Sequence, residues 1–434
     1  MLERIKELLQ QTNTISDFRI TEIRKSGLEW YLIGKEIETA RSKDTLDYEV
    51  AVYVDSNNGS TRGACIFHIQ PTMSVKEITA SINRAVQTAE SIHNDWYPIP
   101  EAHHANNPAP IPMSQFAKMS LSQAMQTVCD SLYKHNGLDG ATINSLEIFL
   151  TKIDEHIINS RGIDIYISKF HGYTEYIVNA GSGKEEIELY DSIHFSEPLL
   201  DTLSNTVRLK LKQAHDRLAA IPTPDCSNLP VIFSGSPAEE FYRYWFQACQ
   251  NSAHYQHTSP FALGENISVP DATGDTITLS AVPFVSGSPF SRPYDSEGFA
   301  LKPITCIDNG ILTMLTGPLK YAHYLKQQAN GSHPLFELSG GKQSKTTLTD
   351  KDHLEAVSFS DFYLDPSTGN FGGELRLGYL VTHGNRIPVT GGSITGSIPE
   401  NRGMILFSRE LVDYATCRAP EICLVPHVRI AKAT

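Results

Sequence analysis

The sequence lacks two features that define large classes of protein: a long apolar run and an excess of positive charge. No window approaches the ~18 consecutive apolar residues that a membrane-spanning helix needs. The 36 basic and 49 acidic residues give a net charge of −13, which argues against a broad basic face for nucleic acid. The beginning, Met1–Gln11, has the pattern of a charged amphipathic helix rather than a signal peptide. We therefore expect a soluble cytoplasmic protein without membrane association, and we do not expect direct nucleic-acid binding.

Paired cysteines are also missing. The seven cysteines are odd in number, scattered and without a CxxC pair, which is typical of buried, reduced thiols. The proline-rich stretch Tyr97–Met113 contains His103-His104, but no third metal ligand lies nearby in the sequence, so we expect a solvated loop. Gly181-Ser-Gly-Lys184 and Gly340-Gly-Lys-Gln343 lack the full spacing of a phosphate-binding P-loop, so we expect turns there.

The length of 434 residues is enough for two domains with large cores. A long helix is predicted over Leu199–Ala219, and the segment Ile221-Pro-Thr-Pro-Asp225 ends it, because proline neither continues a helix nor tolerates helical geometry before it. We place the domain boundary there, which divides the chain into residues 1–222 and 223–434.

The two predicted domains differ in the spacing of their apolar residues. In the first, helices are expected at 1–15, 74–93, 120–136 and 199–219, and strands at 18–36, 47–55, 63–69, 144–159 (as a pair), 163–170 and 173–179. In the second, strands are expected at 277–285, 300–307, 310–316, 356–364, 375–382, 404–408 and 422–430, with one short helix near 318–328. The predicted fold class is α+β: N-terminal helices on antiparallel strands, then a large, mostly antiparallel, barrel-like C-terminal sheet with few helices.

The stretch Leu229–Gln250 has the pattern of a strand, a tight turn and a helix. Val231–Phe233 is a β-branched and aromatic run that Ser234-Gly-Ser-Pro237 interrupts. Ser236 fits an N-cap, with Pro237 at the first helical position and Glu239 completing a capping box. A strand-to-helix turn often carries a reactive group, but the GxSxG pattern of a serine nucleophile is absent, so we expect Ser236 to cap the helix.

Two further segments leave alternatives open. His254 and His257 share one face if the helix continues that far, and with a carboxylate they would bind zinc; the alternative is a surface helix end with two histidines. The polar, glycine-rich run Thr390–Gly403 either lines a cleft for an extended peptide or is only a surface loop.

Several short motifs follow one another along the C-terminal half: Pro260-Phe-Ala-Leu-Gly-Glu-Asn-Ile-Ser268, Arg292-Pro-Tyr-Asp-Ser-Glu-Gly298, Ile307-Asp-Asn-Gly-Ile-Leu312, Gly378-Tyr-Leu-Val-Thr382 with Thr390-Gly391, and Leu424-Val-Pro-His-Val-Arg-Ile-Ala431. In this order and spacing they resemble the TldD/PmbA family, whose PmbA branch is also called TldE. Members are described as modulators of DNA gyrase or as microcin-processing peptidases. The N-terminal half agrees more loosely, through a hairpin and helix at 48–93 and through Ile158-Asn-Ser-Arg-Gly162.

The resemblance implies two domains, dimers and, for the TldD branch, a zinc peptidase with a HExxxH motif on a helix. That helix lines up with Leu229–Gln250, where the six residues are Glu239-Glu-Phe-Tyr-Arg-Tyr244. The two histidine slots hold Glu239 and Tyr244, and only Glu240 is kept. Tyrosine is a poor zinc ligand, and without a metal Glu240 has no acidified water to deprotonate. We therefore expect no metal cofactor, a vestigial Glu240 and a likeness to the PmbA/TldE branch.

The resemblance thus predicts a non-catalytic subunit of a TldD/TldE-type metallopeptidase that binds extended or unfolded peptides. It would form a homodimer or a heterodimer with a TldD-like subunit. We expect Asp295, Glu297, Gly391 and Gly392 at the peptide cleft.

Two alternatives stay open, so the sequence does not decide whether the protein is an enzyme. One is an active homodimeric zinc metallopeptidase in which Glu239 or Glu240 binds the metal with His254, His257 or Cys423. The other is a regulator that binds DNA gyrase or another protein without proteolysis.

Overall fold

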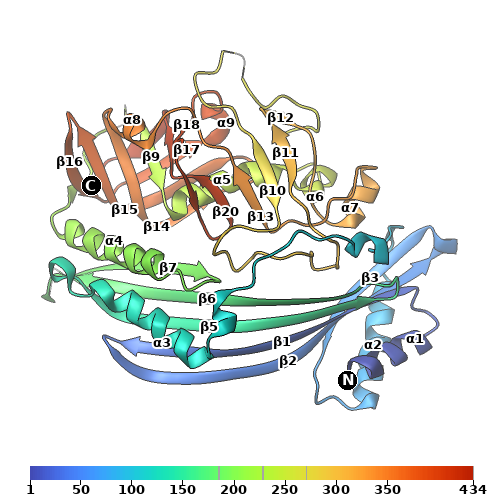
Figure 1. Cartoon of the computed structure of the whole chain (residues 1–434). Helices are drawn as coiled ribbons and strands as arrows, with labels where there is room; N and C mark the ends of the chain where they lie inside the picture. The colour runs from blue at the N-terminus through green and yellow to red at the C-terminus, as the bar shows by residue number, and fades with distance from the viewer. Residues whose placement is uncertain (184–185, 227–228, 270, 434) are drawn as a thin grey trace.

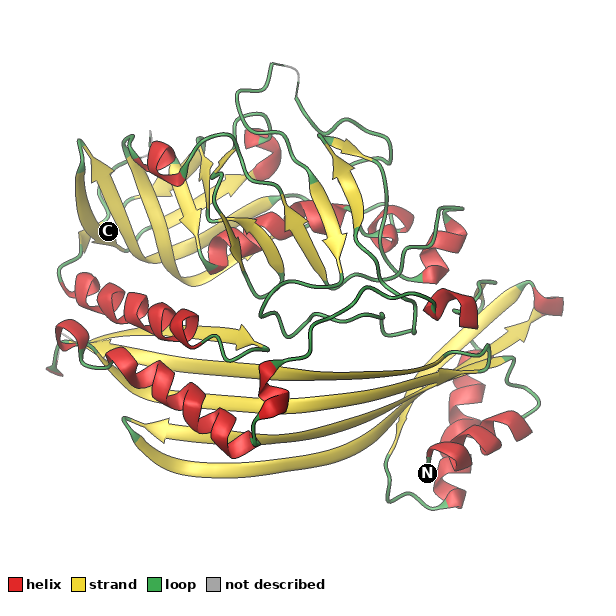
Figure 2. Cartoon of the chain, in the orientation of Figure 1, coloured by secondary structure: helices red, strands yellow, loops and turns green. Residues whose placement is uncertain are grey.

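The computed structural model describes residues 1–183, 186–226, 229–269 and 271–433. The predicted α+β class is confirmed: two layers of mostly antiparallel sheet structure lie one above the other, with helices packed against them (Figure 1; Figure 2). The predicted division at residue 222 stays a prediction. None of the described helices is both long enough and apolar enough to cross a membrane.

The N-terminal half is built on one antiparallel sheet of long strands in the order β4-β3-β2-β1-β5-β6-β7. Its strands are β1 Asp17–Ile33, β2 Glu36–Ser56, β3 Thr61–Ile69, β4 Asn94–Asp95, β5 Thr142–Asn159, β6 Asp164–Ala180 and β7 Ile187–Phe195. Residues of β6 alternate between buried and more exposed along almost its whole length, because successive side chains point to opposite faces of the sheet.

Four helices cover this sheet at its two ends (Figure 1). Helices α1 Leu2–Gln11 and α2 Val75–Glu90 share a core with β1–β3, whereas α3 Leu121–Leu132 and α4 Leu200–Leu218 pack against β5–β7. The predicted capping box of α2 is present: Ser74 accepts from the amide of Glu77, and the Glu77 carboxylate accepts from the Ser74 amide at 2.7 Å. All four helices match their predicted positions closely.

Two predicted strand pairs proved to be single strands, so the predicted breaks in β5 and β6 are wrong. The break predicted between 170 and 173 falls at Gly172, which lies under the ring of Phe195, where an added Cβ would come within 2.1 Å of a ring carbon. Glycine here allows close packing inside a continuous strand. In β5 the polar residues bond across to β6, as Asp154 does with Ser168 at 2.6 Å, so the strand needs no break.

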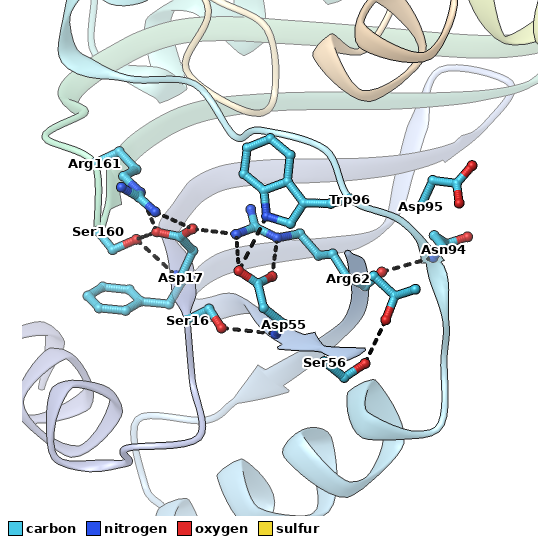
Figure 3. A network of polar contacts seen from close by, with 12 residues as sticks. Ser16, Asp17, Asp55, Ser56, Arg62, Asn94, Asp95, Trp96, Ser160 and Arg161 are labelled. Carbon is cyan, nitrogen blue, oxygen red and sulfur yellow. Dashed lines mark hydrogen bonds and ion pairs between the residues drawn. The ribbon is translucent and has the colours of Figure 1, made fainter. Parts of the chain in front are cut away.

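A polar network fixes the end of the N-terminal sheet (Figure 3). Asp17 on β1 accepts hydrogen bonds from Arg161 (2.6 Å), Ser160 (2.7 Å) and Arg62 (2.9 Å), and Arg62 also pairs with Asp55 at 2.6 Å. Burial raises the pKa of Asp17, but the bonds from Arg161 and Ser160 outweigh it and leave that pKa below its usual value. The turn Ser160-Arg161 is thereby held to β1.

The C-terminal half contains two open sheets within the described residues, rather than one barrel-like sheet. The larger has the order β18-β21-β9-β14-β15-β16-β8, with β17 paired to β15 and β22. Its strands are β8 Ile221–Pro222, β9 Val231–Ser234, β14 His353–Leu364, β15 Asn370–Thr382, β16 Asn385–Thr390, β17 Ser393–Ser397, β18 Leu406–Phe407, β21 Ile422–Val425 and β22 Val428–Ala431. The expected strand at 422–430 is therefore two strands with separate partners.

The smaller sheet has the order β12-β11-β10-β13-β20-β19. Its strands are β10 Leu279–Val282, β11 Ile304–Asp308, β12 Ile311–Leu312, β13 Leu335–Leu338, β19 Leu411–Asp413 and β20 Cys417–Pro420. Helix α5 Ser236–Ala248 contacts both sheets, and one hydrophobic core contains residues of all three. The shorter helices are α6 Asn251–Tyr255, α7 Leu319–Tyr324, α8 Lys345–Thr349 and α9 Ile398–Asn401.

The glycine-containing runs of the sequence have separate outcomes. Thr390–Gly403 is not a loop, because it contains β17 and α9, and its apolar residues Ile394 and Ile398 are fully buried. Gly340–Gln343 is irregular chain between β13 and α8, as predicted. The other run ends at Lys184, which lies outside the described residues.

Candidate functional site

Helix α5 begins one residue earlier than the sequence predicts. Its N-cap is Gly235, which has a φ of 61°, and the Gly235 carbonyl accepts from the amides of Ala238 and Glu239 at 3.1 and 3.0 Å. Ser236 is therefore inside the helix, and no side chain caps it. The predicted cap by Ser236 and the capping box with Glu239 are wrong, because a left-handed glycine turns the chain before Ser236 is reached.

Glu239, in the first histidine slot, ties α5 to the turn before β20. Its Oε1 accepts a hydrogen bond from the backbone amide of Thr416 at 2.7 Å and another from the Thr416 hydroxyl. Burial raises the pKa of Glu239, and the two bonds from Thr416 oppose that rise. This carboxylate has a structural role between α5 and β20.

Tyr244, in the second slot, faces the core and is 1% exposed. Its ring packs edge-on against Trp245 and Phe261, with centroids 5.7 and 6.0 Å away, and lies beside Gly369, where an added Cβ would come within 3.0 Å of it. Burial raises the pKa of Tyr244 to about 12, so the phenolate form is inaccessible at neutral pH. On an ideal helix, Tyr244 is also about 140° around the axis from Glu239.

Glu240, between the slots, is partly exposed, and its carboxylate pairs with Arg243 at 3.5 Å. The other proposed metal ligands are occupied elsewhere. The ring Nε2 of His254 lies 2.8 Å from the carbonyl oxygen of Ala248, and burial lowers the pKa of His254. Cys423 is buried on β21, and burial raises the pKa of its thiol to about 12.

His257 does not share a helix face with His254, because α6 ends at Tyr255 and His257 takes a left-handed φ of 56°. Across the described residues, no three His, Cys, Asp or Glu side chains converge as a metal ligand set. The residues at α5 therefore do not fit the zinc ion that the resemblance implies for the TldD branch.

Asp295 and Glu297 lie in the loop before β11 but have different surroundings. The Asp295 carboxylate is 1% exposed and accepts from three backbone amides: Glu297 and Phe299 at 2.9 Å each and Ser332 at 3.0 Å. These three bonds hold the loop together. This bonding explains the motif Asp295-Ser-Glu-Gly298, which turns around its own aspartate.

Glu297 is close to Tyr53 on β2, to Tyr97 and to Lys320 on α7, at the contact between the two halves of the chain. No described residue donates a hydrogen bond to its carboxylate. Burial, and then the neighbouring charge of Asp295, raises the pKa of Glu297 to about 7, while Arg19 and Lys320 oppose the rise. This carboxyl is therefore poised to change charge near neutral pH.

Gly391 and Gly392 form a left-handed pair between β16 and β17, with φ of 75° and 78°. The Gly391 carbonyl accepts from the Thr223 hydroxyl at 2.7 Å, and the Gly392 carbonyl accepts from the Leu375 amide at 3.0 Å. A Cβ on Gly392 would come within 2.1 Å of the Ala431 carbonyl oxygen. The pair belongs to the larger sheet, whereas Asp295 and Glu297 lie beside the smaller one, and a peptide cleft lined by these four residues stays a prediction.

Sequence reasoning missed a cavity of about 680 Å³ beside β21 and α8. Its lining comes from five separated segments: Pro230, Gln343, Thr347, Leu348, Lys351, Leu406, Leu424 and residues Pro426 to Arg429. The motif Leu424–Ala431, the run Gly340–Gln343 and the expected strand at 404–408 contribute to this lining, but their patterns indicated strands and a turn rather than a binding site.

Comparisons with known proteins agree with this architecture. Residues 227–434 match the family model described as the PmbA/TldA metallopeptidase C-terminal domain. A comparison with curated protein sequences finds no significant match. Among solved structures, TldE from Thermococcus kodakarensis is 16% identical with a TM-score of 0.79, and the alignment covers 99% of this chain and 100% of that one.

Two further solved structures are described as proposed modulators of DNA gyrase. The one from Thermotoga maritima is 15% identical with a TM-score of 0.79, over 99% of this chain and 100% of that one. The one from Bacteroides thetaiotaomicron is 13% identical with a TM-score of 0.78, over 99% and 98%. These identities show a shared fold over the whole length, and the family model identifies the second half. Residues 227–434 thus match the C-terminal domain of the PmbA/TldA metallopeptidase family, and the fold of the whole chain is that of TldE and the two proposed gyrase modulators.

Proposed function

We propose that this protein is a TldE-like, non-catalytic subunit of a TldD/TldE-type metallopeptidase. In this proposal it binds extended peptides, and a TldD-like subunit that carries a complete HExxxH motif supplies the zinc and cleaves them. The observation that carries the proposal is the state of the two histidine slots on α5, which hold a Thr416-bonded Glu239 and a buried Tyr244.

The chemistry of the slots supports the absence of an independent catalytic centre. A zinc peptidase needs three protein ligands and an open position for water, whose pKa the metal lowers. Glu240 alone has no such water to deprotonate, and its carboxylate is beside Arg243. Acquiring ligands at both slots would require Glu239 to leave Thr416 and Tyr244 to leave the core.

Peptide binding in this proposal uses strand addition to a sheet edge, which pairs an extended chain regardless of most of its sequence. Strand β22 offers such an edge, because in the described residues it pairs only with β17. The occupant would be an unfolded or extended peptide, and the dimer partner either a second copy or the TldD-like subunit.

The test is metal analysis and peptide cleavage by the purified chain, alone and with a HExxxH-bearing relative from the same organism. We expect less than about 0.1 zinc per chain, no cleavage alone, and cleavage with the relative that is unaffected by Glu240→Gln in this chain. The matched control is glutamate to glutamine in the relative's own HExxxH, which should abolish cleavage. One tightly held zinc per chain, or cleavage by this chain that Glu240→Gln removes, would instead establish the active homodimeric peptidase.

A second candidate is a regulator that binds DNA gyrase without proteolysis, which the descriptions of two similar structures favour. Affinity purification from cells separates it from the first proposal. Recovery of gyrase without any HExxxH-bearing protein would favour the regulator, and recovery of that protein without gyrase would favour the peptidase subunit.

A further inference from the structure

The cavity of about 680 Å³ lies on the face of the larger sheet that points away from α5. The strand β9 shows this, because Val231 and Phe233 face the core around α5, whereas Ile232 faces Leu348 and Leu424 on the opposite side. Leu348 and Leu424 line the cavity together with Leu406. Its volume is within the range of sites that bind small molecules or peptide side chains, and it is separate from the metal slots.

The charge of this cavity is opposite to that of the chain. Its charged lining residues are Lys351 and Arg429, joined by His427, and none of the lining residues is acidic, although the chain as a whole has a net charge of −13. Neither Lys351 nor Arg429 forms an ion pair with any described residue. An apolar cavity with two unpaired, exposed cations beside it favours a ligand that has an apolar group and a negative charge.

We propose that this cavity binds the C-terminal residue of a peptide. An apolar terminal side chain packs against Leu348, Leu406 and Leu424, and the terminal carboxylate pairs with Lys351 and Arg429. The edge of β22 supports a peptide rather than a free acid, because Arg429 is part of that strand, and among the described strands β22 pairs with β17 on one side only. The proposal names the substrate class for the peptide-binding part of the proposed function, on which it rests, and it is independent of whether this chain binds zinc.

The experiment measures calorimetric binding of acetyl-Ala-Ser-Ala-Ala-Leu to the full chain, as the free acid and as the C-terminal amide, with dodecanoate as a third probe. The variants are Lys351→Gln and Arg429→Gln, and Thr347→Trp, which fills the cavity from an exposed position on α8. Lys342→Gln is the matched control, since Lys342 is exposed nearby but does not line the cavity. Circular dichroism and thermal unfolding confirm that each variant folds.

We expect the free acid to bind at least about tenfold more tightly than the amide, and each cation variant to remove most of that preference. Binding of the acid should weaken as salt rises, because exposed charges are screened. Thr347→Trp should abolish binding, and Lys342→Gln should leave it unchanged.

Equal binding of acid and amide, no binding at 1 mM (a dissociation constant that corresponds to about −4 kcal/mol), or binding of dodecanoate alone would each overturn the proposal. Because no metal or partner is present in this assay, such a failure would leave the non-catalytic subunit role intact. Conversely, zinc in the purified chain would refute that role without removing peptide binding.

Discussion

Glu297 gives the sharpest test of the contact between the two halves of the chain. Its carboxyl is largely buried beside Asp295, near Tyr53, Tyr97, Lys320 and Arg19, and its pKa is raised from 4.5 to about 7. Substitution of Glu297 by glutamine keeps the shape of the neutral acid and removes its ionisation. The variant therefore isolates the cost of placing a carboxylate at this position.

The direction of the pH dependence of stability follows from the linkage between protonation of Glu297 and folding. Because the folded state holds the proton more tightly than the unfolded state, Glu297 contributes stability that is fully present below pH 4.5 and is lost as the pH rises through about 7. At 1.36 kcal/mol per pKa unit, the full loss is about 3 kcal/mol, and we expect about 2 kcal/mol because the side chain is not completely buried. Glu297→Gln should be more stable than the wild type by about 2 kcal/mol at pH 8 and by less than about 1 kcal/mol at pH 5.

Urea unfolding at pH 5, 6.5 and 8 measures the difference. Glu337→Gln on β13, where the glutamate is exposed, is the matched control and should change stability little at any of the three pH values. If Glu297→Gln follows the pH dependence of the wild type, or lowers stability at pH 8, then the ionised Glu297 carboxylate does not destabilise the fold.

Three other variants test the structural roles assigned above. Asp17→Asn leaves the buried guanidinium of Arg62 with one fewer carboxylate, so the free energy of unfolding should fall by about 3–5 kcal/mol. The control Asp44→Asn, at the exposed pair with Arg24, should not change the free energy of unfolding measurably. Equal effects of the two variants in denaturant unfolding would contradict the role of the network. Gly392→Ala places a methyl group against the Ala431 carbonyl at positive φ and should lower the free energy of unfolding by at least about 2 kcal/mol. The control Gly384→Ala is also at positive φ, but no atom lies within 4 Å of the added Cβ, so it should cost less. The reverse order would show that close approach to Ala431 is not what requires glycine at position 392. The double variant Glu239→His with Tyr244→His restores the HExxxH sequence motif. It should still bind no stoichiometric zinc, because the side chain at position 244 faces the core. A tightly held zinc in elemental analysis would contradict that placement.

Local sequence signals predicted the four helices of the N-terminal half well, where independent cues agree. For α2, the apolar spacing and the capping pair Ser74–Glu77 indicate the same boundaries, and the structure has both. The strands were harder because a residue that usually marks a turn can serve packing instead. Position 172 holds a glycine because a larger side chain would collide with the ring of Phe195. Since Phe195 is on another strand, no local sequence pattern reveals this contact.

The candidate site was harder still, because its residues come together only in three dimensions. The cap assignment failed because Gly235 and Ser236 are both plausible caps in sequence, and the choice depends on a backbone angle. Asp295 and Glu297 are two positions apart, but one satisfies backbone amides while the other is close to β2 and α7. The cavity depends on five segments spread over two hundred residues, as its lining from Pro230 to Arg429 shows.

Helix α5 shows why a chain can keep this fold without its metal slots. Phe241 packs against Phe233 and Phe371, Trp245 against Phe407, and the Tyr242 hydroxyl donates to the Pro420 carbonyl at 3.0 Å. Burying each large side chain stabilises the fold by about 1.5–3 kcal/mol, so these contacts hold the two sheets together without a metal. The slots at positions 239 and 244 then take residues that extend the same packing: a carboxylate bonded to the β20 turn and a tyrosine in the core. Under the proposed function, catalysis and folding place separable demands on this helix, and the packing of α5 shows how this chain satisfies those of folding.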